Sequence, residues 1–264
     1  MELDKEHVMN EVIKIARRAG DFIRHEGAGF DRDKIEEKSL NNLVSYVDLE
    51  AEKMIVQTLK FTLPDAGFIT EEGTATERSE EFNWVVDPLD GTTNFLHGLA
   101  PYSVSIALMH KQKVIIGVVY EINRDECFYA FEGGKAFLNR KPIQVSPVKK
   151  FEEGLYITGF PYREFDKVKN FIGSMEYFMK HTHGLRRSGS AAADLAYVAC
   201  GRCEGFYETG LNAWDVAAGA LIIREAGGKV TDFSGGEDYL FGSTIVAGNA
   251  DVQQQMVDAL KKLY

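Results

Sequence analysis

The segment 84–94, Trp-Val-Val-Asp-Pro-Leu-Asp-Gly-Thr-Thr-Asn, constrains the fold more than any other part of this chain. Its apolar start predicts a strand that carries Asp87 to its carboxyl end, and Pro88 keeps Asp87 out of helical geometry. Gly91 allows a sharp bend, and Thr92 can begin a helix whose first N–H groups face that bend. Such a corner offers hard oxygen ligands to a divalent cation beside an anion-binding helix end. The same residues also suit a surface turn that caps a helix, so both interpretations stay open at this point.

Hydrophobic periodicity predicts both helices and strands in the first half of the chain. Apolar residues at helical spacing predict a helix over 8–23 that ends near Gly27. A short strand over 43–47 precedes Asp48, which we expect to be the N-cap of a helix that runs to about Phe61. Four further strands, the last three forming an antiparallel meander, are expected over 68–70, 103–109, 114–120 and 126–131.

The second half alternates between strand and helix patterns. Strands are expected over 155–158, 205–208 and 245–247, and helices over 167–179, 190–200, 214–226 and from 251 onward. The chain turns polar near its middle, which predicts an N-terminal α+β lobe over 1–148 and a C-terminal α/β lobe over 149–264. The pattern therefore predicts a mixed α/β (α+β) protein of two packed lobes.

Composition and charge argue against several classes of function. The chain has 45% hydrophobic and 27% charged residues, which is typical of an ordinary soluble globular protein. Its net charge of −10 argues against a nucleic-acid-binding surface, because phosphate backbones attract basic side chains. No apolar run approaches the length of about 18 residues that a membrane helix needs. Its three cysteines, two of them in Cys200-x-x-Cys203, do not make a disulfide framework, so we expect a cytoplasmic protein.

Four more short signals place functional groups at the ends of predicted elements. Glu71 and Glu208 each end a predicted strand, and Asp215 lies in the first turn of an Ala-rich helix. The turn Gly189-Ser190-Ala191 leads into a helix and would allow close approach of the backbone to a ligand. Taken singly, Glu71 and Glu208 could be surface loop charges, and Asp215 could simply complement the helix dipole.

Taken together, these segments resemble the inositol monophosphatases, a family of magnesium-dependent, lithium-sensitive phosphomonoesterases. The motifs W-V-V-D-P-L-D-G-T-T-N-F over 84–95 and W-D-V-A-A-G over 214–219 occur in the family's order and at a similar separation. The resemblance spans nearly the full length of the chain. It implies a layered αβαβα sandwich of two lobes, of the sugar-phosphatase type, and a homodimer.

The resemblance also implies a metal site formed by the carboxylates of Glu71, Asp87, Asp90 and Asp215 and the backbone carbonyl of Leu89. One Mg²⁺ would lie between Glu71, Asp87 and the Leu89 carbonyl. A second would lie among Asp87, Asp90 and Asp215, and a third would be held through Glu71 and water, giving two to three ions per subunit. Mg²⁺ prefers oxygen ligands and keeps several waters, so a few carboxylates per ion suffice. Without cations, these carboxylates would repel one another.

Catalytic roles are implied for Thr92, Asp48 and Glu71. The Thr92 hydroxyl, paired with Asp48, matches the couple that orients the attacking water, and Glu71 helps to hold that water. The backbone N–H groups of Gly91 and Thr92 match the positions that receive the phosphate. The positions that match contacts to substrate are Asp90, Gly91, Thr92, Gly189, Ser190, Ala191 and Glu208.

Three positions in the first part of the chain complicate the comparison. Lys38 matches a loop lysine near the metals. Thr70 stands where the family usually has glycine, which would tighten the end of the strand. Asn42 occupies a position that is often acidic, which weakens the expectation that its loop contributes to a third metal site.

The implied reaction is direct in-line hydrolysis of a phosphomonoester by metal-activated water, with inositol-1-phosphate as the expected substrate. Alternatives on the same scaffold are a fructose-1,6-bisphosphatase, a histidinol-phosphatase and a phosphoadenosine or NADP phosphatase. Glu208 favours the inositol type, because a carboxylate accepts hydrogen bonds from neutral hydroxyls and repels a second phosphate. A more remote alternative is a regulatory protein without catalysis, against which the complete ligand set argues. The expected partner is a small sugar or cyclitol phosphate, with neither nucleic acid nor membrane involved.

Overall fold

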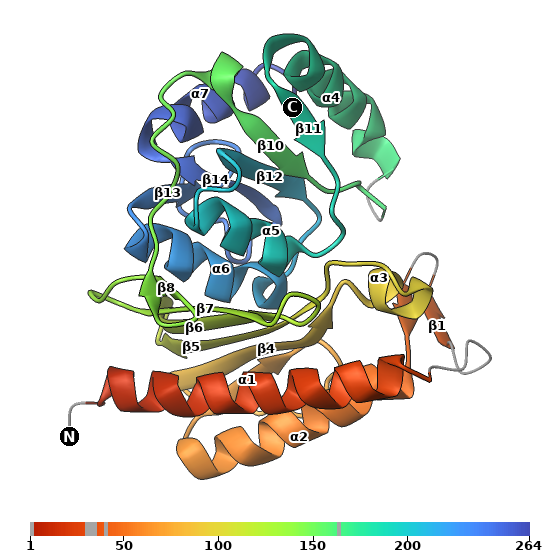
Figure 1. The fold of residues 1–264 in the computed structure, drawn as a ribbon, viewed down its shortest axis with the longest axis vertical. Coiled ribbons are helices and arrows are strands. Elements are labelled where there is room, and N and C mark those ends of the chain that lie inside the picture. Colours follow the sequence, from red (N-terminus) through yellow and green to blue (C-terminus); the bar gives the residue numbers. More distant parts are fainter. Residues whose placement is uncertain (1–2, 30–35, 40–41, 163–164) are drawn as a thin grey trace.

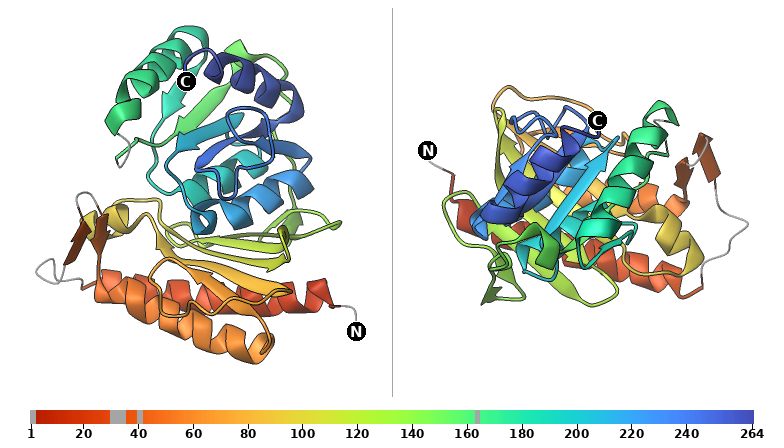
Figure 2. Two further views of the ribbon diagram at one scale, coloured as in Figure 1. Left: turned by 180° about the vertical axis from the view of Figure 1, so that it is seen from behind. Right: turned by 90° about the horizontal axis from the view of Figure 1, so that it is seen from above.

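The protein is described by a computed structural model that covers residues 3–29, 36–39, 42–162 and 165–264. Helical layers alternate with two sheets, and the order is the same when the molecule is seen from behind (Figures 1 and 2). The outer layer at one end consists of α1 (Lys5–Gly27) and α2 (Tyr46–Thr62). The middle layer consists of α5 (Ala191–Ala199) and α6 (Ala213–Glu225). The outer layer at the other end consists of α4 (Val168–His181) and α7 (Ala250–Leu260). The layered αβαβα sandwich implied by the sequence is therefore confirmed.

Among the described residues, seven strands form the large sheet in the order β3-β4-β5-β6-β7-β8-β9. They are β3 (Gly67–Thr70), β4 (Phe82–Asp90), β5 (Ser103–His110), β6 (Lys113–Glu121), β7 (Glu126–Phe131), β8 (Phe137–Leu138) and β9 (Lys141–Pro142). The pair β3–β4 is parallel, and every other neighbouring pair is antiparallel. The predicted meander is confirmed.

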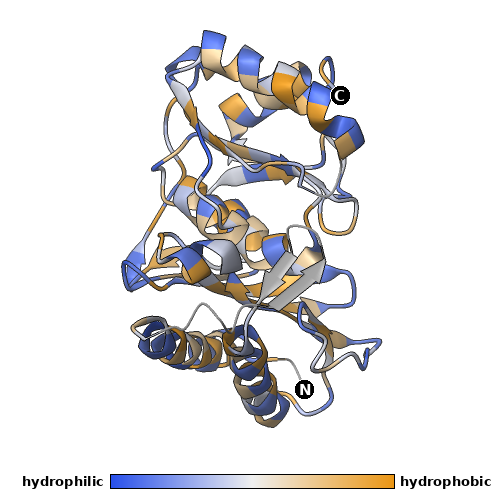
Figure 3. Ribbon diagram, turned by 90° about the vertical axis from the view of Figure 1, so that its right-hand side faces the viewer, coloured by the Kyte–Doolittle hydropathy of each residue, from blue (hydrophilic) through white to orange (hydrophobic). Residues whose placement is uncertain are grey.

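Helices α1 and α2 cover one face of this sheet. Apolar side chains from both helices and from the sheet, such as Val12, Ile55 and Trp84, form one buried cluster. These outer helices alternate between hydrophilic and hydrophobic colour in Figure 3, as expected for elements with one face against a sheet and the other in solvent.

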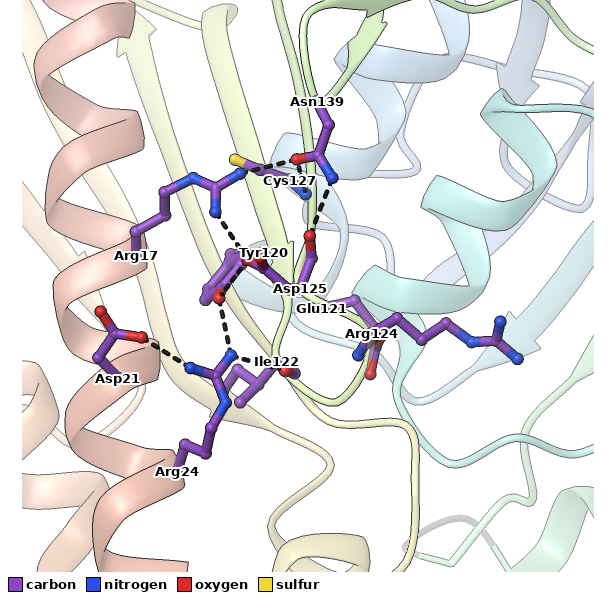
Figure 4. A network of polar contacts seen from close by, with 10 residues as sticks. All are labelled: Arg17, Asp21, Arg24, Tyr120, Glu121, Ile122, Arg124, Asp125, Cys127 and Asn139. Carbon is purple, nitrogen blue, oxygen red and sulfur yellow. Dashed lines mark hydrogen bonds and ion pairs between the residues drawn. The ribbon is translucent and has the colours of Figure 1, made fainter.

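A polar network also fastens α1 to the end of the central strand β6 and the turn that follows it (Figure 4). Arg17 Nη1 donates to Asp125 Oδ1 at 2.7 Å, and Arg24 Nη2 donates to the Tyr120 hydroxyl at 2.8 Å. The Tyr120 hydroxyl in turn donates to Asp125 Oδ1 at 2.8 Å. The carboxylate of Glu121 accepts the N–H groups of residues 123 and 124 and fixes the turn between β6 and β7. The network thus joins α1 to the turn that ends β6.

In the described part of the chain, the small sheet has five strands in the order β11-β10-β12-β14-β13. They are β10 (Leu155–Thr158), β11 (Gly184–Arg186), β12 (Gly205–Thr209), β13 (Gly228–Thr231) and β14 (Thr244–Asn249). Strand β10 is parallel to both of its neighbours, whereas β14 is antiparallel to β12 and β13. The two-stranded sheet of β1 (Glu36–Ser39) and β2 (Asn42–Val44) and the short helix α3 (Thr92–His97) lie to one side of the large sheet.

Small residues bring the middle helices into close contact with the large sheet. A Cβ at Gly117 of β6 would lie 2.7 Å from the carbonyl oxygen of Ala218 on α6. A Cβ at Gly219 would lie 2.5 Å from the Leu195 side chain of α5. The packing therefore fixes the depth at which α6 lies over the sheet, and with it the position of Asp215 in the first turn of α6.

The predicted start of α2 is wrong by a few residues. We expected a strand over 43–47 and a helix capped by Asp48, but β2 ends at Val44 and the helix begins at Tyr46. Ser45 is the N-cap, and Asp48 is the third helical residue, whose Oδ2 accepts the Ser45 N–H at 2.9 Å. The pattern Ser-x-x-Asp is a capping box, in which both residues satisfy free N–H groups.

Other expectations from the sequence have clear outcomes. The helices expected over 8–23, 167–179, 190–200 and 214–226 are present with shifts of a few residues at their ends. All three cysteines are free thiols. Within the described residues, no helix is both long enough and apolar enough to span a membrane. The boundary between lobes at residue 148 stays a prediction.

Candidate active site

The segment that opened the sequence analysis forms a strand, a tight turn and a helix. Strand β4 continues to Asp90, and its pairing with β5 is irregular between Asp87 and Asp90. The Leu89 N–H donates to Asp87 Oδ1 at 2.9 Å, which holds the carboxylate beside the backbone. Gly91 has a φ of +90°, and α3 begins directly after it. The irregular strand end thus projects Asp87 and Asp90 to the same side.

Gly91 is required by space as well as by backbone conformation. A Cβ at this position would lie 3.1 Å from the carbonyl oxygens of both Gly189 and Pro101. Asn94 joins the same two segments, since its Nδ2 donates to the carbonyl oxygens of Pro101 and Ser188 at 2.8 Å each. The end of β4 therefore lies directly against the turn that leads into α5.

Three carboxylates converge at this point. Asp87, Asp90 and Asp215 each offer one oxygen, and these oxygens lie within 4.8 Å of one another. Asp215 is held by the N-terminus of α6, where its Oδ2 accepts the Asn212 N–H at 2.6 Å. Glu71 follows β3, and its carboxyl group lies close enough to Asp87 and Asp215 to interact with both. The structure thus brings together all four carboxylates named from the sequence.

Burial and mutual repulsion disfavour the charged forms of these carboxylates. Burial raises the pKa of Glu71 to about 8, and the charge of Asp215 adds to this rise. The pKa of Asp87 is well above its usual value because of burial and the charges of Glu71, Asp90 and Asp215. Burial also raises the pKa of Asp90, and the hydrogen bond from Ser190 partly opposes this rise. A divalent cation would remove this repulsion, so a donor set of clustered carboxylate oxygens suits a hard cation.

Asp48 and Thr92 form a hydrogen-bonded pair at the edge of the carboxylate cluster. The Thr92 hydroxyl lies 3.0 Å from Asp48 Oδ1 and 3.0 Å from the Leu89 carbonyl oxygen, and it can donate to either. Asp48 Oδ2 accepts from the N–H and the hydroxyl of Ser45. Burial raises the pKa of Asp48, whereas its hydrogen bonds oppose the rise. The two oxygens of Asp48 thus serve the helix cap and Thr92 separately.

The turn Gly189-Ser190-Ala191 lies against the other side of Asp90. Ser190 is the N-cap of α5, and its hydroxyl donates to Asp90 Oδ2 at 2.5 Å. The N–H of Ala192 donates to the same oxygen at 2.8 Å. The Ser190 side chain is buried and also contacts the Ser103 hydroxyl at 3.0 Å. Its side chain therefore supports Asp90.

Glu208 lies at the carboxyl end of β12, and a Cβ at Gly159 would come within 1.8 Å of its Oε1. Burial raises the pKa of Glu208 well above its usual value, and the positive charge of Arg187 opposes the rise. The Arg187 guanidinium lies over the rings of Phe160 and Tyr162, 5.4 and 5.7 Å from their centroids. The charges of Asp90 and Asp215 also act on Glu208, so this carboxylate lies near the carboxylate cluster.

The sequence reasoning overlooked several residues that shape the site. The sequence analysis gave Arg187 no role, although it lies two positions before Gly189. Asp194 is buried in α5, and burial raises its pKa to about 8. No sequence pattern singled out Glu52 of α2, because its hydrogen-bond donors lie 20 and 22 residues further along the chain.

The three positions that complicated the family comparison have different outcomes. The Thr70 hydroxyl donates to the Ala75 carbonyl oxygen at 3.1 Å and ties down the loop after β3. The side chains of Lys38 and Asn42 lie outside the described part of the structure, although their backbones belong to β1 and β2.

Comparisons with known proteins agree with this arrangement. The model of the inositol monophosphatase family matches residues 4–263. An inositol-1-monophosphatase of Mesorhizobium japonicum is 40% identical over 97% of this chain and 96% of its own length. The Nus factor SuhB of Escherichia coli is 39% identical over 97% of this chain and 99% of its own length.

Solved structures show the same similarity. The extragenic suppressor protein suhB of Bartonella henselae has a TM-score of 0.92 at 39% identity, over 97% of this chain and 99% of that one. The inositol monophosphatase of Anabaena has a TM-score of 0.88 at 31% identity, over 98% of this chain and 97% of that one. By its sequence, its fold and its clustered carboxylates, the chain belongs to the inositol monophosphatase family.

Proposed function

We propose that this protein is a Mg²⁺-dependent phosphomonoesterase that hydrolyses inositol-1-phosphate to inositol and phosphate. The observation that carries the proposal is the convergence of Asp87, Asp90 and Asp215 within 4.8 Å, beside the pair formed by Thr92 and Asp48. Carboxylates from distant parts of the chain meet where a hydroxyl can orient a water, which is the arrangement that metal-assisted hydrolysis needs.

Two or three Mg²⁺ ions would be held by these residues. One would use Glu71, Asp87 and the Leu89 carbonyl, the second Asp87, Asp90 and Asp215, and a third Glu71 through water. When bound, paired ions activate a water and neutralise charge at both ends of an in-line displacement. The raised pKa values of Glu71 and Asp87 support this assignment, because burial and mutual repulsion both disfavour the charged carboxylates and a bound cation would favour them.

The side chains around the metal site would orient the attacking water. When the Thr92 hydroxyl donates to Asp48 or to the Leu89 carbonyl, its lone pairs can accept a hydrogen bond from a water. Glu71 would accept the other proton of the same water. The water would attack phosphorus opposite the ester oxygen, and positioning would supply much of the rate.

The substrate would be held on both sides of the ester bond. The N–H groups of Gly91 and Thr92 would bind the phosphate at the start of α3. Asp90, Glu208 and the backbone of the turn 189–191 would bind the ring hydroxyls. Since the Ser190 hydroxyl already donates to Asp90, Ser190 would act mainly by holding that carboxylate.

A kinetic panel tests this proposal directly. Release of phosphate would be measured with inositol-1-phosphate, fructose-1,6-bisphosphate, histidinol phosphate and 3′-phosphoadenosine 5′-phosphate, each with Mg²⁺ and with EDTA. We expect the highest kcat/KM for inositol-1-phosphate and no turnover in EDTA. A clear preference for another ester would assign one of the alternative substrates, and turnover in EDTA would contradict the metal-dependent reaction.

A second candidate is a role of the kind named in the relatives called Nus factor SuhB, which are 39–42% identical to this chain. Such a role could exist beside catalysis. The Asp90→Asn variant separates the two, because it removes a metal ligand and leaves the protein surface unchanged. A cellular function that survives in this variant would belong to the second candidate.

Homodimer formation, a cytoplasmic location and inhibition by Li⁺ are further parts of the proposal. The homodimer and the inhibition by Li⁺ rest on the family alone, and the cytoplasmic location rests on the lack of a disulfide framework among the three cysteines. Light scattering coupled to gel filtration measures the first, and phosphate release at increasing LiCl measures the last, with KCl as the control for ionic strength.

A further inference from the structure

Helix α2 carries two buried carboxylates one helical turn apart, Asp48 and Glu52. Side chains at positions i and i+4 lie on the same face of a helix. Asp48 reaches Thr92, the first residue of α3 after the end of β4. Glu52, which is 0% exposed, reaches the segment that follows β3. One face of α2 therefore contacts both segments that carry the proposed water-orienting groups.

Every hydrogen bond described for the Glu52 carboxylate goes to the segment directly after Glu71. Its Oε2 accepts the Glu72 N–H at 2.8 Å. Its Oε1 accepts the Thr74 N–H at 2.8 Å and the Thr74 hydroxyl at 2.7 Å. Gly73, between these donors, has a φ of +71°, which lets the chain turn around the carboxylate. Burying a carboxylate is costly unless hydrogen bonds compensate, so this contact is specific.

The segment after β3 also has other contacts with the protein, including one between Glu71 and Asp87 and the packing of Ala75 against the apolar cluster of α1, α2 and the large sheet. The Glu71 N–H donates to the Val86 carbonyl oxygen at 3.2 Å, and the Thr70 hydroxyl donates to the Ala75 carbonyl oxygen at 3.1 Å. Residues 71–75 are all partly or largely exposed. Among these contacts, the hydrogen bonds to the buried carboxylate of Glu52 are the ones that tie the backbone on the C-terminal side of Glu71 to helix α2.

We infer that Glu52 is a positioning residue, which holds Glu71 at the metal site in register with Thr92 through the common helix α2. The role of Glu71 as a metal ligand rests on the proposed function. The positioning of Glu71 by Glu52 does not depend on it. If Glu52 is removed, Glu71 is expected to sample more positions, so cation binding weakens even though every metal ligand is still present.

The test compares Glu52→Gln with the matched control Glu50→Gln. Glu50 lies on the same helix, is exposed, and bonds to Lys53 Nζ at 2.7 Å. In Glu52→Gln, the side-chain amide group must face an N–H donor, so at least one hydrogen bond is lost and two donors meet. The loss of a charged hydrogen bond in a buried site corresponds to about a tenfold change in an equilibrium constant.

Two readouts are independent of hydrolysis. The first is hydrogen exchange of the amides over 71–75, which we expect to be about tenfold faster in Glu52→Gln than in Glu50→Gln. The second is a Mg²⁺ titration followed by tryptophan fluorescence, with Trp214 beside Asp215 as the reporter. The Mg²⁺ concentration at half-saturation is expected to rise about tenfold in Glu52→Gln and to stay unchanged in Glu50→Gln.

A milder variant keeps the test informative if Glu52→Gln does not fold. Thr74→Val removes the hydroxyl donor but keeps the N–H, and we expect about a threefold rise in the half-saturating Mg²⁺ concentration. Unchanged exchange and unchanged Mg²⁺ titration in the folded variants would overturn the inference. If the wild-type protein binds Mg²⁺ but hydrolyses none of the tested esters, the proposed function fails, whereas these two readouts still decide the role of Glu52.

Discussion

At the scale of single residues, carboxylates of the site divide their two oxygens between structure and chemistry. Asp90 Oδ2 receives the Ser190 hydroxyl and the Ala192 N–H, which ties it to the start of α5. Asp48 uses Oδ2 for the helix cap and Oδ1 for Thr92. A truncation at either position would disturb both tasks, so isosteric changes are needed to separate them.

Asp90→Asn is the first such change. The amide oxygen can still accept from Ser190 and Ala192, whereas the amide nitrogen, which cannot bind a cation, replaces the second carboxylate oxygen. We expect turnover of inositol-1-phosphate to fall at least about a hundredfold, as when a key electrostatic group is removed. Steady-state kinetics at several Mg²⁺ concentrations measure this, and near-normal rates would contradict the role of Asp90.

The stability of the same variant checks that the lost activity does not come from unfolding. Because burial raises the pKa of Asp90, the charged carboxylate destabilises the folded state at neutral pH when cations are absent. A neutral side chain removes this penalty. We expect Tm in EDTA to be equal to or higher than that of the wild type, as measured by calorimetry. A markedly lower Tm would attribute the effect to damage of the fold.

Glu208→Gln tests recognition of the substrate. A carboxylate accepts hydrogen bonds from ring hydroxyls more strongly than an amide does. We expect KM for inositol-1-phosphate to rise about tenfold with a smaller change in kcat. Phenyl phosphate, which lacks ring hydroxyls, is the control substrate and should show little change in KM. Equal losses for both esters would place Glu208 outside hydroxyl recognition.

At the scale of elements, the depth of α6 over the large sheet determines where Asp215 lies. In Gly117→Ala, the new Cβ would lie 2.7 Å from the Ala218 carbonyl oxygen, so the helix or the strand must shift. We expect a loss of about 1–3 kcal/mol in the free energy of unfolding, typical of overpacking, together with weaker Mg²⁺ binding. Chemical denaturation and Mg²⁺ titration measure both effects.

Gly173→Ala is the matched control for this prediction. Gly173 lies in α4, and a Cβ there would meet only Leu263, at 3.9 Å. Alanine favours a helix over glycine by up to about 1 kcal/mol, so this variant should be as stable as the wild type or more stable. Similar destabilisation of both variants would show that close packing at Gly117 is not the cause.

Much of the element order could be predicted from the sequence, because it follows from local patterns. Apolar spacing predicted α1, α5 and α6, and alternation predicted the meander of β5, β6 and β7. The short strand β11 was missed, since Gly184–Arg186 has only three residues and its partner β10 lies far away in sequence. The start of α2 was misplaced because Ser45 and Asp48 can each act as an N-cap.

At the scale of the whole molecule, the candidate site gathers groups from both halves of the chain. The motifs predicted the carboxylates themselves, and the structure brings Asp87, Asp90 and Asp215 together. Glu52, Asp194 and Arg187 could not be assigned in the same way. The roles of these three residues depend on their burial and on contact partners that the tertiary fold supplies. No local sequence pattern indicates burial or partners of this kind.

The raised pKa values of two acids, Glu71 and Asp194, predict how the stability of the entire protein depends on pH. The pKa values of Glu71 and Asp194 are each raised to about 8, so the folded state binds more protons than the unfolded state between about pH 5 and 8. Stability should therefore fall as pH rises through this window, by up to about 1.4 kcal/mol per pH unit for each group. Calorimetry in EDTA at several pH values measures this slope.

Mg²⁺ and a single substitution should separate the two contributions to that slope. Saturating Mg²⁺ favours the charged form of Glu71, so it should flatten the part of the slope that comes from the metal site. The pKa of Asp194 is raised mainly by burial and to a smaller extent by the charge of Asp90, so most of its share should persist with Mg²⁺. Asp194→Asn should remove that share in both conditions. The Asp194→Asn variant then tests the carboxylate cluster alone. If Mg²⁺ left the pH slope of this variant unchanged, the idea that a bound cation relieves repulsion among the clustered carboxylates would be wrong.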